Sequence, residues 1–210
     1  MGFLKLAGRF CCQFGRSTFL LLLSSCLVSA QSKSYDGDWW ELRTAAEQEG
    51  FILGYGDCYA DPAGQRIRML LDDADIRIAV STYYQGHQKF RTRPVAQVLK
   101  DIWAGHISVH DAKRSAAREG WRERHGYFDG LWWKGSNPTE QLGFVEGYTT
   151  CHNRELRKAK PLEFQPANYV QLISAWYTPA GDESVVAHHQ AEKIADVLLR
   201  FSEHAGSASR

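Results

Sequence analysis

Apolar residues recur at helical spacing along most of the chain. A helix over 94–103 is predicted by five apolar side chains at positions i, i+3, i+4, i+7 and i+8. These are Val95, Val98, Leu99, Ile102 and Trp103. The segment 184–201 carries a similar stripe. Only 76–82, which is rich in β-branched residues, is ambiguous between helix and strand. The pattern therefore predicts an all-α protein.

One sequence pattern occurs twice, at an offset of 93 positions and without a gap. The first copy runs from Asp36 to Cys58 and the second from Asp129 to Cys151, and both read D-G-x-W-W-x7-Q-x-G-F-x-x-G-Y-x-x-C. We interpret this as a tandem duplication. We expect six or seven helices in two three-helix repeats related by a pseudo-two-fold axis.

The repeat also predicts how the chain is divided. Second helices are expected over 72–84, where an aspartate is placed as N-cap, and over 166–177, which opens with a proline. Alignment of the third helices needs about six extra residues in the second copy. The expected segments are a signal peptide (1–30), helical repeat 1 (31–105), a connector helix (106–128), helical repeat 2 (129–204) and a flexible tail (205–210).

Glycines four residues apart mark the long helix of each repeat: Gly50 and Gly54 in the first, Gly143 and Gly147 in the second. A glycine inside a helix costs about 1 kcal/mol relative to alanine, so two per helix require a local reason. We expect a narrow face that admits the equivalent helix of the other repeat. An antiparallel pair crossing at the glycines would hold the cysteines about 12 Å apart. A disulfide therefore needs a crossing near the cysteines or a roughly parallel pair.

The first thirty residues have the features of an export signal. Basic residues precede a short apolar run, and small residues follow at the positions that a signal peptidase reads. They are Lys5, Arg9 and Arg16, then 19–23, then Val28-Ser29-Ala30. The apolar run is too short to cross a bilayer as a helix. We expect cleavage before Gln31 and a secreted or periplasmic protein.

A second interpretation of this segment uses Leu23-Ser24-Ser25-Cys26, which resembles the lipobox of bacterial lipoproteins. Cys26 would then be lipidated, and the protein would be held at a membrane surface. The plain alternative is that Cys26 is one more small apolar residue of the signal. Membrane association is expected only if Cys26 is lipidated.

Charge and cysteines restrict the partners and the compartment. After residue 30 the chain keeps all 24 acidic residues and loses three of its 25 basic ones, which leaves a net charge near minus two. This balance predicts no nucleic-acid partner. Cys58 and Cys151 are the only cysteines after residue 30, and in an oxidising compartment they are expected to form a disulfide. The alternative is two buried free thiols.

Aromatic residues at repeat-equivalent positions are the candidates for binding. They are Trp39, Trp40, Trp132, Trp133, Tyr84 and Tyr177. Adjacent tryptophans cannot both face inward from one helix, so at least one of each pair is expected to be exposed. Exposed aromatic side chains are typical of protein interfaces, although core packing between the halves is the alternative.

No catalytic residue, metal site or cofactor is expected from the sequence, because no established motif is present. His106 and His110 have the spacing of metal ligands, but a capping box at Ser108 places His106 outside the helix. The matched carboxylates of Asp36 and Asp129 leave a hydrolase open as the alternative, with His125 or His152 between the repeats. An Asp-Gly pair before a helix is more typical of a turn or cap.

The G-F-x-x-G-Y segments 50–55 and 143–148 resemble the glycine helix of small periplasmic immunity proteins that neutralise type VI secretion amidase effectors. The resemblance covers some ten residues per copy. It implies an all-α, disulfide-containing, often dimeric protein that plugs the cleft of an enzyme. This chain departs from it by carrying the unit twice and by its tryptophan pairs, and no inhibitory residue can be assigned by this route. The sequence therefore favours an exported, non-enzymatic protein that binds or inhibits a partner protein or binds a cell-envelope ligand.

Overall fold

The computed structural model divides the chain into two compact units, Met1–Ser34 and Tyr35–Arg210. It describes residues 35–60, 73–86, 88–107, 128–156, 159–180 and 182–205, all of which belong to the second unit. The expected signal peptide with Cys26, most of the expected connector helix and nearly all of the expected tail lie outside these residues.

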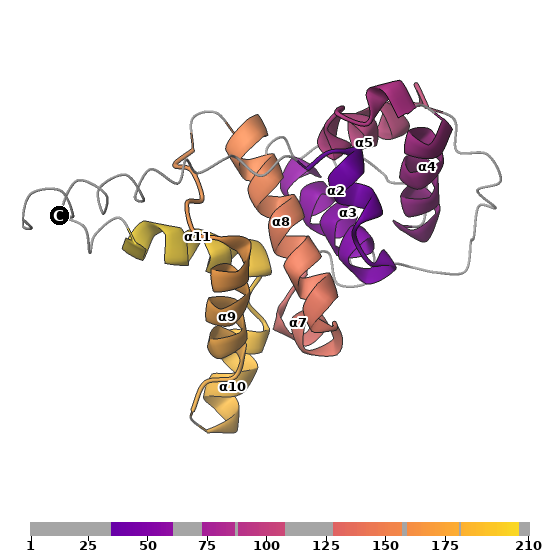
Figure 1. The fold of residues 1–210 in the computed structure, drawn as a ribbon. Coiled ribbons are helices and arrows are strands. Elements are labelled where there is room, and N and C mark those ends of the chain that lie inside the picture. Colours follow the sequence, from indigo (N-terminus) through magenta and orange to yellow (C-terminus); the bar gives the residue numbers. More distant parts are fainter. Residues whose placement is uncertain are drawn as a thin grey trace, which may run out of the picture. The chain divides into compact units, whose positions relative to one another are not determined.

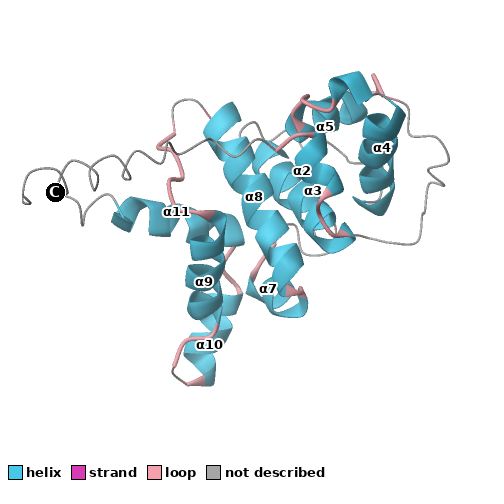
Figure 2. Cartoon of the chain, viewed as in Figure 1, coloured by secondary structure: helices cyan, strands magenta, loops and turns pink. Residues whose placement is uncertain are grey.

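The described residues form nine α-helices and one short 3₁₀ helix, with no β-strand among them (Figures 1 and 2). The α-helices are α2 (Gly37–Glu41), α3 (Ala45–Ala60), α4 (Asp73–Gly86), α5 (Val95–Trp103), α7 (Gly130–Gly135), α8 (Pro138–Glu155), α9 (Pro166–Tyr177), α10 (Glu183–Gln190) and α11 (Ile194–Ala205), and the 3₁₀ helix is η1 (Gln88–Phe90). The prediction of an all-α protein is confirmed for this part of the chain. None of the helices described is long and apolar enough to cross a membrane.

The described helices outnumber the six or seven predicted because three predicted segments are each divided: the first segment of each repeat and the segment 184–201. The D-G-x-W-W sequence forms a separate short helix, after which Thr44 or Asn137 caps the following long helix by accepting backbone N–H groups. The segment 184–201 is interrupted after Gln190, where Lys193 forms an isolated β-bridge with Asp129. The ambiguous segment 76–82 is helical and lies inside α4.

The Asp-Gly pairs begin the short helices α2 and α7. Asp36 accepts the backbone N–H of Trp39 at 3.1 Å, and Asp129 accepts two N–H groups of its helix at 3.0 Å each. The glycine that follows leaves room for a tyrosine ring. A Cβ on Gly37 or Gly130 would lie 2.8 Å from the Cε1 atom of Tyr84 or Tyr177, closer than real Cβ atoms approach.

The second tryptophan and the glutamine of each motif fasten these short helices to the rest of their half. Trp40 and Trp133 donate their indole N–H to Ser81 and Ser174, at 2.9 and 3.0 Å. Gln48 and Gln141 donate a side-chain N–H to the backbone oxygens of Trp40 and Trp133, both at 2.7 Å. All four bonds are long-range or connect successive helices, so the motif specifies tertiary contacts.

Helices α3 and α8 lie side by side and form the most extensive contact among the described elements (Figure 1). Gly50 faces Glu140 and Phe144, and Gly54 faces Phe144. In the same way, Gly143 faces the backbones of Glu47 and Phe51, and Gly147 faces those of Phe51 and Tyr55. Because the contacting residue numbers rise together on the two helices, the pair is parallel.

The disulfide of Cys58 and Cys151 joins α3 to α8, with 6.0 Å between the two Cα atoms. The predicted pairing is confirmed. Of the two geometries that could allow it, the structure has the parallel pair, in which matched positions of the two helices remain close along their length. The disulfide closes a covalent loop of 93 positions.

The third helices are held by matching backbone bonds. The N–H of Val95 donates to the oxygen of Tyr35 at 2.8 Å, and the N–H of Ile194 donates to that of Phe128 at 2.9 Å. The acceptors are 93 positions apart and the donors 99, as the six extra residues expected in the second copy require. Both helices bury aliphatic residues against α4 or α9.

Candidate functional site

The six aromatic residues proposed as binding candidates all lie in the interior. Trp39 and Trp132, the most exposed of them, keep 6% and 7% of their surface accessible. The others are Trp40, Trp133, Tyr84 and Tyr177, at 2% or less. The prediction that one tryptophan of each pair is exposed is therefore wrong.

Both tryptophans of a pair are buried because their short helix has neighbours on two sides. In α2, Trp40 reaches α4, while the ring of Trp39 lies 5.0 Å from those of Tyr35 and Phe51. In α7, Trp132 contacts Phe128 and Phe144 with ring centroids 4.9 and 5.0 Å apart. The two faces of a five- or six-residue helix can thus be covered by different elements.

Tyr84 and Tyr177 each join two segments of the chain in the interior. Their rings cover the motif glycines, and their hydroxyls donate to the backbone oxygens of Arg93 and Glu192, at 2.8 and 3.0 Å. Burial raises the pKa of both hydroxyls well above its ordinary value of about 10. Burial also raises the pKa of Tyr35 and Tyr55.

We expect these four tyrosines to make the protein sensitive to alkali. Because their pKa values are raised in the folded state, their stabilising effect is complete below about pH 10 and is lost as the pH rises further, when the unfolded chain releases phenolic protons that the folded chain retains. The urea midpoint should be flat up to about pH 9 and should fall above about pH 10. Ultraviolet absorbance of phenolate measures the same effect. Simultaneous ionisation of all nine tyrosines near pH 10 in the folded protein would contradict it.

The carboxylates considered for a hydrolase have structural contacts. Asp36 and Asp129 cap α2 and α7, so the interpretation of Asp-Gly as a helix start is confirmed. His152 is buried, and its Nε2 atom lies 2.9 Å from the backbone oxygen of Lys160. His125 and His110 lie outside the described residues. In the part of the chain that the structure describes, no group of three or more His, Cys, Asp or Glu residues could hold a metal ion.

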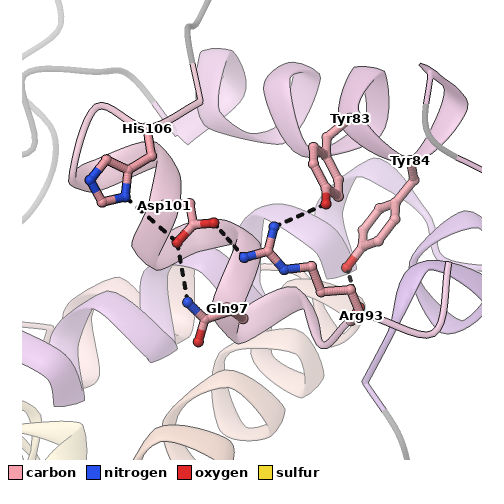
Figure 3. Close-up of polar contacts among 6 residues, drawn as sticks. All are labelled: Tyr83, Tyr84, Arg93, Gln97, Asp101 and His106. Atoms are coloured by element: carbon pink, nitrogen blue, oxygen red, sulfur yellow. Dashed lines mark hydrogen bonds and ion pairs between the residues drawn. The ribbon is translucent and has the colours of Figure 1, made fainter. Parts of the chain in front are cut away.

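A partly exposed cluster surrounds the side chain of Arg93, which precedes α5 (Figure 3). Its guanidinium donates to the hydroxyl of Tyr83 at 2.9 Å and to the carboxylate of Asp101, and it also lies over the Tyr83 ring. The ring of Phe90 stacks on Tyr83, and 41% of the Phe90 surface is exposed. Gln97 supports Asp101 through a hydrogen bond of 3.1 Å. We call Tyr83, Phe90, Arg93 and Asp101 the first aromatic–arginine cluster.

A similar group lies in the second half and contains Trp176, His189, Glu192 and Arg200, the second aromatic–arginine cluster. The imidazole of His189 stacks on Trp176 with ring centroids 4.0 Å apart, and the Arg200 guanidinium carbon lies 4.5 Å from the Trp176 ring. Glu192 accepts a hydrogen bond from Arg200 at 2.6 Å. His189 is further fixed by a contact of 2.7 Å between its Nδ1 atom and the backbone oxygen of Trp176.

The two clusters occupy equivalent positions but differ in charge order. Tyr83 and Trp176 are 93 positions apart, and the other pairs are 99 apart, beyond the insertion. The positive and negative residues of the ion pair come in opposite order along the chain in the two clusters. Arginine stands before the helix and aspartate within it in the first cluster, whereas glutamate stands before it and Arg200 within it in the second.

Each cluster presents an aromatic side chain and a fixed guanidinium at a partly exposed place. Tyrosine, tryptophan and arginine are the residues enriched at the energetic centres of protein interfaces. The sequence analysis selected Tyr84 and Tyr177, which are buried, whereas their neighbours Tyr83 and Trp176 are the partly exposed members of these aromatic pairs. Comparison of the chain with protein-family models, with curated proteins and with solved structures gave no match.

Proposed function

We propose that this chain is an exported, non-enzymatic binding protein that binds or inhibits a partner protein, or binds a cell-envelope ligand, through its two aromatic–arginine clusters. The observation that carries the proposal is a difference in burial between two groups of aromatic residues. Those of the repeated motif are buried in structural contacts, whereas Tyr83, Phe90, Trp176 and His189 stay partly accessible beside fixed charges. Preorganised aromatic and arginine side chains lose little conformational freedom when they bind.

We further infer that the two halves arose by duplication and are related by a pseudo-two-fold axis. Support comes from reciprocity at the α3–α8 contact: Gly54 faces the backbone of Phe144, and Gly147, which is 93 positions further along, faces the backbone of Phe51. A contact in which i meets j and j meets i is the signature of a two-fold interface. The motif hydrogen bonds repeat at an offset of 93 positions, and the residues of the two clusters repeat at offsets of 93 or 99 positions.

Export is supported by the disulfide, because such bonds persist in oxidising compartments. Both interpretations of the N-terminal segment, cleavage before Gln31 and lipidation of Cys26, would deliver the helical unit to such a compartment. The hydrolase alternative has less support. Asp36 and Asp129 are each engaged by backbone N–H groups of their own helices, and Cys151 in its disulfide has no thiolate to act as a nucleophile.

Replacing Phe90 by alanine tests the binding surface. We expect the affinity for an envelope partner to fall at least about fivefold, because truncation of an interface anchor typically costs more than about 1 kcal/mol. The free energy of unfolding should change little, since Phe90 is among the exposed large apolar residues. The measurement is quantitative affinity capture from an envelope extract with the wild-type and variant proteins.

Ile78→Ala is the matched control, because Ile78 is 51% exposed on α4 and belongs to neither cluster. It should retain partners within about twofold of the wild type. The equivalent change in the second half is His189→Ala. Equal recovery of the same partners by the wild type, Phe90→Ala and His189→Ala would refute the proposed surface.

A further inference from the structure

The contacting faces of α3 and α8 are identical in sequence at six matched positions. In α3 they are Glu47, Gly50, Phe51, Gly54, Tyr55 and Cys58, and in α8 they are Glu140, Gly143, Phe144, Gly147, Tyr148 and Cys151. Contacts across the pair are reciprocal, and each cysteine meets its own equivalent. A face that fits its equivalent in this way also fits a copy of itself.

The residues beside these faces distinguish the two halves. Glu146 of α8 is fully buried, with 0% of its surface exposed, whereas the equivalent position of α3 is Leu53. Tyr35 lies nearby in the first half, because its ring contacts Phe51, whose backbone faces Gly147. Burial raises the pKa of Tyr35, the carboxylate of Glu146 raises it further, and Arg43 lowers it.

The second half has no counterpart of this polar environment. The position equivalent to Tyr35 is Phe128, which has no phenolic hydroxyl, and the position equivalent to Arg43, whose ion pair is with Glu47, is Ser136. We therefore expect the buried carboxylate of Glu146 to be better accommodated beside Tyr35 of the first half than beside Phe128 in another copy of its own half. Burying a carboxylate away from compensating groups is strongly unfavourable.

We propose that the glycine faces form a docking surface that also fits a second copy of this chain, and that Glu146 directs α8 toward α3 of its own chain. The inference rests on the two-fold relation proposed above. A single buried polar residue is known to determine helix pairing in this manner. In the wild-type protein, pairing of α8 with α8 would bury two glutamates against apolar and hydroxyl neighbours.

The alternative helix pairing can be recognised by a different set of disulfide bonds. Two chains that each hold a Cys58–Cys151 disulfide can be converted into one dimer with a Cys58–Cys58 and a Cys151–Cys151 disulfide. Two S–S bonds break and two form, so no net oxidation occurs. The exchange needs only a catalytic thiolate, which a glutathione buffer supplies and recovers.

Oxidative refolding of the full chain in a glutathione buffer, followed by mass-spectrometric mapping of disulfide-linked peptides, tests the inference. Pairing within one chain benefits from an effective concentration on the order of millimolar, so the experiment compares micromolar with near-millimolar protein. The wild type should give Cys58–Cys151 at both concentrations. Glu146→Leu should raise Cys151–Cys151 linkage at least about tenfold at the higher concentration.

A transplant of the polar group provides the matched control. Its changes are Tyr35→Phe, Arg43→Ser and Glu146→Leu together with Leu53→Glu, Phe128→Tyr and Ser136→Arg. This variant should restore Cys58–Cys151 as the dominant linkage. Failure of the transplant to restore it would overturn the role of Glu146, as would a Glu146→Leu protein that pairs like the wild type.

Glu146→Gln covers the case in which Glu146→Leu does not fold, because it keeps the shape of the side chain and removes its charge. It should shift the linkage in the same direction by several-fold, and an unchanged linkage would overturn the inference. None of these variants alters an aromatic–arginine cluster. Failure here is therefore distinguishable from failure of the binding surface tested with Phe90→Ala.

Discussion

Replacing Gly54 by alanine is expected to lower the free energy of unfolding by about 3 kcal/mol. A Cβ at this position would lie 2.7 Å from the carbonyl carbon of Phe144 on the facing helix. Backbone atoms cannot rotate away as a flexible side chain could, so α3 and α8 would have to separate. Urea unfolding followed by circular dichroism measures the loss.

Gly86→Ala is the control for this experiment, since Gly86 ends α4 and an added Cβ would meet nothing within 4 Å. It should leave the stability within about 0.5 kcal/mol of the wild type. The variant Gly147→Ala, which introduces the same clash from the other helix, should resemble Gly54→Ala. If all three variants were as stable as the wild type, the close parallel contact would be refuted.

Replacing Cys151 by serine is expected to cost about 4 kcal/mol, because the disulfide closes a loop of 93 positions and restricts the unfolded chain. Removal of the bond also leaves Cys58 unpaired at a buried site. Differential scanning calorimetry and urea unfolding, each with and without reductant, measure the effect.

Three versions of the protein should have the same free energy of unfolding: Cys58→Ser, Cys151→Ser and the reduced wild type. The double variant should be no less stable than either single variant by more than about 0.5 kcal/mol, since both residues act through one bond. Additive losses from the two substitutions, or a reductant effect that persists in Cys151→Ser, would show that the cysteines act independently.

Much of the architecture could be predicted from the sequence because the motif repeats without a gap. The spacing of apolar residues located α4, α5 and α9 almost to the residue. The matched cysteines predicted the disulfide, and the separation of the cysteines from the glycines along each helix limited the helix pair to a parallel arrangement or a crossing near the cysteines. The choice between these two required the contacts of Gly50 and Gly54 with the facing backbone.

The exposure of the tryptophans could not be predicted from periodicity. Adjacent residues on a helix point about 100° apart, which suggests one buried and one exposed side chain when a helix has a single covered face. Helix α2 is only five residues long and has neighbours on two sides, so Trp39 packs on α3 while Trp40 reaches α4. This environment depends on tertiary structure that the local pattern does not contain.

The choice between neighbouring aromatic residues on α4 and α9 was similarly underdetermined. On α4, positions 83 and 84 continue the apolar stripe equally well, at i+7 and i+8 from Ile76. The buried member is the one whose ring fits over a motif glycine, and that contact joins segments 47 positions apart. A signal was present on α9, where Tyr169, Ile173 and Tyr177 follow strict i+4 spacing and are all buried.

Whether the repeated motif builds two halves joined through parallel glycine helices is tested most directly by the disulfide connectivity of the protein isolated from cells. It should be isolated under acidic conditions with free thiols blocked, digested and analysed by mass spectrometry. We expect one linked peptide pair that joins Cys58 to Cys151 within a single chain. Two blocked free thiols at these positions in the protein as isolated would contradict it.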